Sequence, residues 1–149
     1  MALEVDILGM LNKEFIEIKI EYIQRDLNRL ESMSGLTIDE VAKDYTKYAA
    51  LKNFLMEIIG RAIDINEHII SEAGSVELEA PLKYKETFLQ LAKMDILPGN
   101  FAEKIAKSAG FRNAVVYDYN NLDKYIIYKS VGEAIEQYTK YCGYILKFI

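Results

Sequence analysis

Apolar residues recur every three or four positions along most of this chain, and this helical period constrains the fold more than any other feature. Two such stripes lie side by side in the first 30 residues. The first contains Leu8, Leu11, Phe15, Ile18 and Tyr22, and the second contains Ile16, Ile20, Ile23, Leu27 and Leu30. A helix with two apolar stripes has to contact more than one neighbour. No segment alternates with a period of two, so the sequence predicts no β-sheet.

The stretch "SMSGLT" ends this first helical pattern and precedes a second one. Thr37, three residues before Glu40, forms a capping-box pattern that opens a helix. We expect this helix to continue without a break until Gly74 and Ser75. Its predicted buried face consists of Leu51, Leu55, Ile58, Ala62, Ile65 and Ile69.

The second half of the chain predicts three more helices. Pro81 suits the first turn of a short helix that reaches about Met94. Asn100 and Glu103 can cap the next helix. We expect this helix to pass through Gly110 at a cost of about 1 kcal/mol relative to alanine, and the alternative is a break there. The last helix carries apolar residues at the same spacing, namely Tyr128, Val131, Ile135, Tyr138, Cys142, Ile145 and Ile149.

Four long helices and one short helix with tight connections predict an all-α fold. The natural arrangement is an antiparallel four-helix up-and-down bundle with an extra short helix, formed by residues 1–149 as a single domain. The apolar stripes on the first, second and last helices are wider than one core requires. We therefore expect the chain to form a homodimer through a helical face.

Composition excludes several classes of function. With 18 basic and 23 acidic residues the net charge is −5, which argues against non-specific coating of nucleic acid. A single cysteine, Cys142, and a single histidine, His68, argue against an internal disulfide and a metal site, and we expect no cofactor. The N-terminal segment does not resemble a signal peptide, and no apolar run approaches about 20 residues. We expect a cytoplasmic protein without a membrane span.

The segment "GFRNAVVYDYNN", residues 110–121, combines polar and aromatic residues with a helical pattern. Arg112 carries a guanidinium group, which is always charged and binds phosphate oxygens in a forked geometry. Tyr119 lies seven residues later, on the same helical face, and Asn113 is a polar neighbour. Tyr117 lies about 140° around the helix from Arg112. The pattern equally allows Arg112 to pair with a carboxylate while the tyrosines pack their rings.

A second polar group lies in "RAIDINEH". Arg61, Asp64 and His68 are spaced i, i+3 and i+7, on one side of the second helix. Asp64 is within reach of His68, and a carboxylate beside an imidazole orients it and favours its protonated form. This arrangement suits a general acid or base. It suits a plain ion-pair network on the flank of the helix equally well.

Three segments in order carry a family resemblance: "LKNFLMEIIGRAIDINEHIISEAG", "YKETFLQLAKMDILP" and "FAEKIAKSAGFRNAVVYDY". Together they resemble the HepT-like family of HEPN-domain proteins over residues 51–123. The resemblance implies a HEPN-like fold and an RNA-cleaving toxin that acts as a homodimer. In that family two motifs, each an arginine followed after four to six residues by a histidine, meet in a cleft at the dimer interface.

The resemblance also implies a partner and a set of site residues. The partner is a minimal nucleotidyltransferase antitoxin, which makes the chain the toxin of a type VII toxin–antitoxin pair and a metal-independent RNA endonuclease. Arg112 corresponds to the motif arginine and Asn113 to the asparagine beside it. Tyr119 corresponds to the tyrosine that accepts AMP in some members. Residues similar to Arg61, Asp64 and His68 recur in the family and would line the same cleft.

Tyr117 stands where the family has its motif histidine. Histidine has an unperturbed pKa of about 6.5, whereas tyrosine has a pKa of about 10, so Tyr117 is a poor base but can donate a proton. His68 is a candidate substitute for the missing histidine. An alternative function is a catalytically impaired HEPN module that binds a nucleotide, RNA or a partner. A third is a structural helical dimer, which predicts that Arg112 and His68 are both engaged in internal salt bridges.

Overall fold

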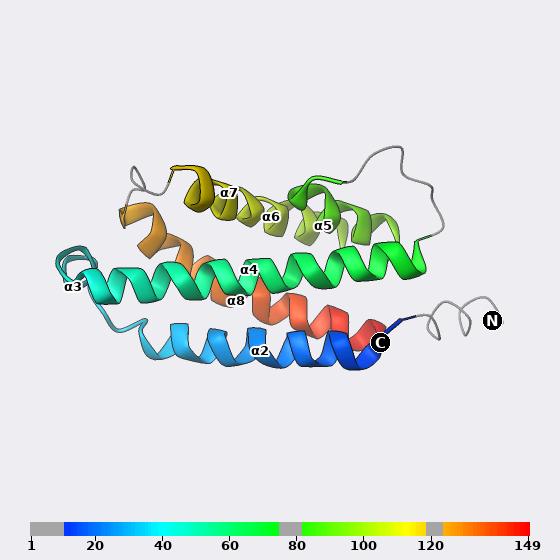
Figure 1. Cartoon of the computed structure of the whole chain (residues 1–149), viewed down its shortest axis with the longest axis horizontal. Helices are drawn as coiled ribbons and strands as arrows, with labels where there is room; N and C mark the ends of the chain where they lie inside the picture. The colour runs from blue at the N-terminus through cyan, green and yellow to red at the C-terminus, as the bar shows by residue number, and fades with distance from the viewer. Residues whose placement is uncertain (1–10, 75–81, 119–123) are drawn as a thin grey trace.

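A computed structural model describes residues 11–74, 82–118 and 124–149, without the side chains of residues 115–118. This part of the chain contains helices and no strands (Figure 1). The helices are α2 (Lys13–Ser32), α3 (Ile38–Lys43), α4 (Tyr45–Ala73), α5 (Tyr84–Lys93), α6 (Gly99–Ala106), α7 (Ser108–Asp118) and α8 (Lys124–Phe148). None of them is long and apolar enough to cross a membrane.

The long helices alternate in direction as an up-and-down bundle. In Figure 1, α2 and α4 run antiparallel, α6 and α7 together return alongside α4, and α8 runs antiparallel to α6 and α7. Helix α5 packs against α6 and α4 as the extra short element. The predicted all-α, four-helix bundle with one short helix is confirmed.

The apolar stripes predicted the core well, with one exception. All the residues predicted for the buried face of the second helix are buried on α4, and so is the second stripe of the first helix on α2. The other stripe of α2 is only partly covered, because Ile18 and Tyr22 are 43% and 41% exposed. Leu8 lies outside the described residues. The helical face of α2 that carries Ile18 and Tyr22 is therefore not fully covered by any other helix of the described part of the chain.

The predicted second helix is in fact two helices, and the prediction of an unbroken element was wrong. Thr37 caps α3 as expected, since its side chain accepts a hydrogen bond from Glu40 N at 3.2 Å. The backbone is then extended at Asp44, with φ −112° and ψ 104°. The Asp44 carboxylate accepts hydrogen bonds from the backbone N–H groups of Thr46 and Lys47 and so starts a new helix. Helix α4 ends at Gly74, as predicted.

The segment after Met94 also differs from its prediction. Helix α6 begins at Gly99 with Pro98 as its N-cap, so Asn100 lies inside the helix and does not cap it. The chain then breaks at Lys107 and continues as α7, which contains Gly110. Gly110 is helical, but the prediction of one helix from Asn100 through Gly110 was wrong, because the chain breaks at Lys107. Helix α5 begins at Tyr84, and Pro81 lies outside the described residues.

Candidate functional site

Helix α7 is fixed at its first residue by contacts with α6 and α8. The Ser108 hydroxyl donates a hydrogen bond to the backbone carbonyl of Ile105 at 2.6 Å. The Ser108 and Tyr138 oxygens are hydrogen-bonded at 2.5 Å, and Tyr138 is fully buried on α8. Ala109 is also buried. These contacts set where Arg112, one helical turn later, leaves the helix.

The half-buried side chain of Arg112 lies between α4 and α5. Its guanidinium carbon is 4.9 Å from the centre of the Tyr84 ring, which is a cation–π contact. On the α4 side, a Cβ atom placed on Gly60 would lie 3.5 Å from Arg112 Nε. Among the side chains that the structure describes, no carboxylate forms an ion pair with Arg112. Its positive charge is therefore held by an aromatic face and not by an acid of the described chain.

The position of Tyr84 depends on a buried polar network between α4, α5 and α8. Thr87 donates a hydrogen bond to the Tyr84 carbonyl at 2.7 Å and accepts one from Asn66 at 3.1 Å. The Tyr141 hydroxyl bonds to Asn66 at 2.6 Å and to the carbonyl of Ala62 at 3.1 Å. Each buried side-chain polar atom of the described residues has a hydrogen-bond partner. The network ties the first turn of α5, and with it the Tyr84 ring, to α4.

The other residues predicted in this segment are only partly described. Asn113 follows Arg112 and is exposed. The backbone of Tyr117 lies in α7, but its side chain lies outside the described residues, as does the whole of Tyr119. The roles predicted for Tyr117 and Tyr119 therefore stay predictions.

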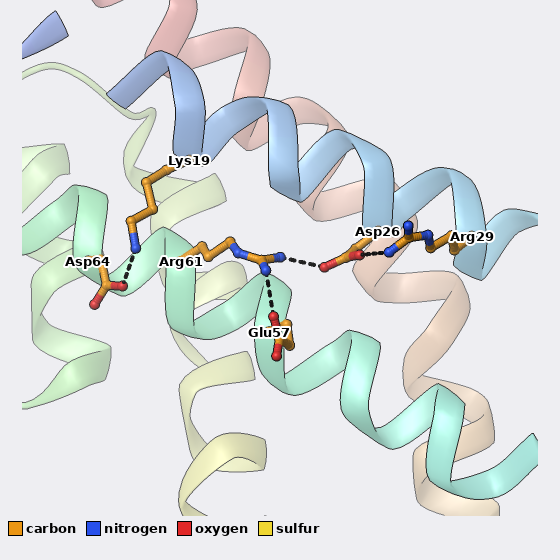
Figure 2. A network of polar contacts seen from close by, with 6 residues as sticks. All are labelled: Lys19, Asp26, Arg29, Glu57, Arg61 and Asp64. Atoms are coloured by element: carbon orange, nitrogen blue, oxygen red, sulfur yellow. Dashed lines mark hydrogen bonds and ion pairs between the residues drawn. The ribbon is translucent and has the colours of Figure 1, made fainter. Parts of the chain in front are cut away.

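Arg61 lies on α4 and points toward α2, where it joins an ion-pair network (Figure 2). Its Nη1 donates to Asp26 Oδ2 at 2.5 Å, and its Nη2 donates to Glu57 Oε2 at 2.5 Å. The guanidinium carbon also lies 5.1 Å from the centre of the Tyr22 ring. Asp26 is buried and accepts a further bond from Arg29 at 3.1 Å. Arg61 therefore pairs with carboxylates of its own chain, whereas no described carboxylate pairs with Arg112.

Asp64 and His68 do not form the pair that their spacing suggested. Asp64 is paired with Lys19 of α2 at 3.0 Å (Figure 2). The His68 Nε2 instead accepts a hydrogen bond from the backbone N–H of Asn12 at 3.0 Å, and its ring lies 5.1 Å from that of Phe15. The pairing fails because Lys19 offers the Asp64 carboxylate an opposite charge, while the imidazole satisfies an amide at the start of α2.

The geometry brings Arg112 and Arg61 to the same turn of α4. Arg112 approaches Gly60 from α7, and Arg61, the next residue, reaches toward α2; Figure 1 shows α4 between these two helices. His68 lies eight residues after Gly60, which corresponds to about 12 Å of helix. Neither Arg112 nor His68 forms a salt bridge with any described side chain. The alternative of a purely structural dimer predicted such salt bridges for both residues, and the described side chains do not provide them.

A groove of about 1000 Å³ lies on another side of α7, between α6, α7 and α8. Its lining includes Lys104, Lys107, Phe111, Ile126 and Lys140, and it does not include Arg112. The Arg112 site is therefore separate from this groove. Within the described ranges, no group of three or more histidine, cysteine, aspartate or glutamate residues is placed to hold a metal ion.

Gly60 and Tyr84 are the two residues of this site that sequence reasoning missed. A glycine inside a 29-residue helix is a usable signal, because it costs about 1 kcal/mol relative to alanine and needs a reason. Tyr84 gave no comparable signal, because its contact with Arg112 joins residues 28 positions apart in the sequence.

Comparison with known proteins identifies a family and several relatives of this chain. A family profile described as "Ribonuclease HepT-like" matches residues 23–145. The tRNA nuclease HepT of Aphanizomenon flos-aquae is 30% identical over 134 residues, which cover 90% of this chain and 89% of that protein. The mRNA nuclease HepT of Shewanella oneidensis is 24% identical over 127 residues, covering 85% of this chain and 92% of the other.

Solved structures show the same fold. A tri-AMPylated Shewanella oneidensis HEPN toxin in complex with MNT antitoxin superposes with a TM-score of 0.77 at 24% identity, covering 89% of this chain and 97% of that one. A toxin–antitoxin structure with AMP-PNP superposes with a TM-score of 0.78 at 23% identity, covering 90% and 98%.

Proposed function

Because the chain belongs to the HepT-like ribonuclease family, we propose that it is an RNA endonuclease whose Arg112 binds the phosphate at the cleavage site. The observation that carries this proposal is the environment of Arg112. Its guanidinium has an aromatic ring on one side, and no described carboxylate neutralises it. The guanidinium N–H groups can therefore donate hydrogen bonds to phosphate oxygens of the RNA, as they would to the carboxylate of an internal ion pair.

Cleavage would proceed without a metal ion by attack of the ribose 2′-hydroxyl on the adjacent phosphorus, with the hydroxyl proton passing to water. The bond to the 5′-oxygen of the next nucleotide breaks, which leaves a 2′,3′-cyclic phosphate and a free 5′-hydroxyl. The guanidinium group of Arg112 stabilises the extra negative charge on the phosphate oxygens in the transition state. The phenol of Tyr117 is the candidate donor of a proton to the leaving oxygen. Asn113 is a candidate hydrogen-bond donor to the RNA.

The active form is proposed to be a cytoplasmic homodimer in which two Arg112 sites share one cleft. The partly exposed apolar face of α2, with Ile18 and Tyr22, supports burial against another molecule. Arg61 and Asp64 would line the cleft from α4 as substrate-binding residues, with their ion pairs holding them in place. His68 would serve as a base only after giving up the Asn12 amide, since that amide occupies its Nε2 lone pair.

The proposed partner is a minimal nucleotidyltransferase antitoxin, as in a type VII toxin–antitoxin pair. The Shewanella oneidensis HEPN toxin was solved AMPylated and in complex with such an antitoxin. By analogy, the antitoxin would silence this chain by transferring AMP to Tyr119.

Purified protein incubated with tRNA and with mRNA tests the nuclease proposal. Arg112→Ala is expected to lower the cleavage rate by about 100-fold or more, because one charged transition-state contact is lost. Arg25→Ala is the matched control, since it also removes one arginine, on α2, that forms no ion pair with any described side chain. Product ends should carry 2′,3′-cyclic phosphate. Equal cleavage by wild type and Arg112→Ala would remove Arg112 from the mechanism.

A second candidate function is a catalytically impaired module that binds RNA, a nucleotide or the partner. It is favoured by Tyr117 at the histidine position and by the engagement of His68 Nε2 with the chain itself. A Tyr117→His variant separates the two functions. Cleavage that appears only in this variant would support the impaired module, whereas cleavage already present in the wild type would support the nuclease.

A further inference from the structure

Gly60 differs from the other glycines that the structure describes. A Cβ atom at Gly35, Gly99, Gly110, Gly132 or Gly143 would meet nothing within 4 Å, and one at Gly74 would meet only the backbone of Ile70. A Cβ atom at Gly60 would meet the side chain of Arg112, from a different helix, at 3.5 Å from Nε. The Arg112 side chain therefore packs against α4 at the position where the helix has no side chain.

Tyr84 contacts the same guanidinium from α5. The ring centre is 4.9 Å from the guanidinium carbon, and the Tyr84 side chain remains 37% exposed. An aromatic ring attracts a guanidinium through the face of its π system and leaves the N–H groups at the guanidinium edge free to donate. A carboxylate in this position would have occupied those donors.

We propose that Gly60 and Tyr84 form a slot that positions Arg112 for RNA binding, which makes both of them positioning residues. The inference rests on the proposed function of Arg112. The bare backbone at Gly60 allows the arginine to lie close to α4, and the Tyr84 ring limits its movement on the α5 side. The slot therefore reduces the number of conformations of a long side chain before substrate arrives, without neutralising its charge.

The size of the slot predicts different effects for two substitutions of Gly60. Alanine adds one carbon at 3.5 Å from Arg112 Nε, which is an ordinary van der Waals contact. Valine adds two further carbons on Cβ, and these compete with Arg112 for the same space. We expect Gly60→Ala to keep cleavage within about threefold of wild type and Gly60→Val to lower kcat by about 10–100-fold.

The matched control is Gly143→Val on α8. Gly143 is also inside a helix, is exposed, and has open space where a Cβ atom would lie. Gly143→Val should keep or raise the melting temperature, since valine is a better helix former than glycine. Gly60→Val should still unfold in a cooperative melting transition, which shows that any loss of activity is not a loss of fold. Only Gly60→Val should lose activity. A loss of activity in Gly143→Val of the same size would overturn the inference.

Tyr84 supplies a second test that does not change α4. Tyr84→Phe keeps the ring and should cleave RNA at close to the wild-type rate, whereas Tyr84→Leu should lose about 10-fold in kcat. Binding of fully 2′-O-methylated RNA, which cannot be cleaved, provides a readout besides activity. Its affinity should fall in Gly60→Val and Tyr84→Leu and not in Gly60→Ala or Tyr84→Phe. Equal affinities for all four variants would overturn the inference.

Combination with Arg112→Ala separates failure of this inference from failure of the proposed function. If the slot acts through Arg112, adding Gly60→Val to Arg112→Ala should cause no further loss. A further 10-fold loss in the double variant would show that Gly60 acts elsewhere. If Arg112→Ala alone changes neither cleavage nor RNA affinity, the proposed function fails. If it abolishes them while Gly60→Val and Tyr84→Leu behave like wild type, only the slot fails.

Discussion

Asp26 is a buried carboxylate on α2 whose two oxygens accept hydrogen bonds from different arginines. Arg61 of α4 binds one oxygen, and Arg29 of α2 binds the other (Figure 2). The side chain of Asp26 is 6% exposed, so its charge would be strongly unfavourable without these partners. This single residue thereby holds Arg61 toward α2, while Arg112 lies beside the preceding residue of α4.

Asp26→Asn is expected to lower the free energy of unfolding by about 1–3 kcal/mol, because the arginines lose a buried charged acceptor. Glu136→Gln is the control, since Glu136 is 72% exposed and pairs only with Lys140 among the described side chains. That change should stay within about 0.5 kcal/mol. Urea denaturation of both variants measures the difference. Equal stabilities would contradict a structural role for Asp26.

At the scale of elements, two helix breaks determine where α4 and α7 begin, and these two helices carry Gly60 and Arg112. Asp44 separates α3 from α4, and Lys107 separates α6 from α7. The second break leaves Ser108 free to bond with Tyr138 on α8, and α7 then starts from a fixed point. Because Ser108 fixes the first residue of α7, Arg112 one turn later lies beside Gly60 of α4 and Tyr84 of α5.

The Asp44 cap gives a prediction with a close control. Asp44→Ala should destabilise the protein by about 1 kcal/mol, because the N–H groups of Thr46 and Lys47 lose their acceptor. Asp44→Asn keeps a capping oxygen and should stay near wild-type stability. Thermal melts compare the two. A stability of Asp44→Ala equal to that of Asp44→Asn would mean that the break does not depend on the side chain.

At the scale of the whole molecule, the core contains ionisable groups that must stay protonated. Burial raises the pKa of the Cys142 thiol from 9.0 to about 12. Burial also raises the pKa values of Tyr138 and Tyr141 above 10.0. Unfolding exposes these groups, which then lose protons at their ordinary pKa values. The folded state therefore binds more protons than the unfolded state above about pH 9, and stability must fall as the pH rises.

The melting temperature is expected to be insensitive to these three groups below about pH 9 and to decline between pH 9 and pH 11. Cys142→Ala should flatten the first part of this decline, near pH 9, even though it lowers stability at neutral pH. Tyr45→Phe is the control, because Tyr45 is 73% exposed and its substitution should change the decline much less than Cys142→Ala does. A wild-type melting temperature that stays constant to pH 11 would contradict the prediction.

The sequence by itself determined the helical class and the core of α2, α4 and α8. Apolar spacing reports burial directly, because each stripe has to face the interior. The breaks at Asp44 and Lys107 were missed because local capping and a tertiary bond to Tyr138 override a continuous apolar period.

Only the tertiary structure decided the partners of the polar residues. Asp64 is four residues from His68, yet it pairs with Lys19, 45 positions away in the sequence. Arg112 lies against Gly60 and Tyr84, which no local pattern connects to it. Helical period determines which face a side chain occupies, whereas the packing of one helix against another determines which charge or ring it meets there.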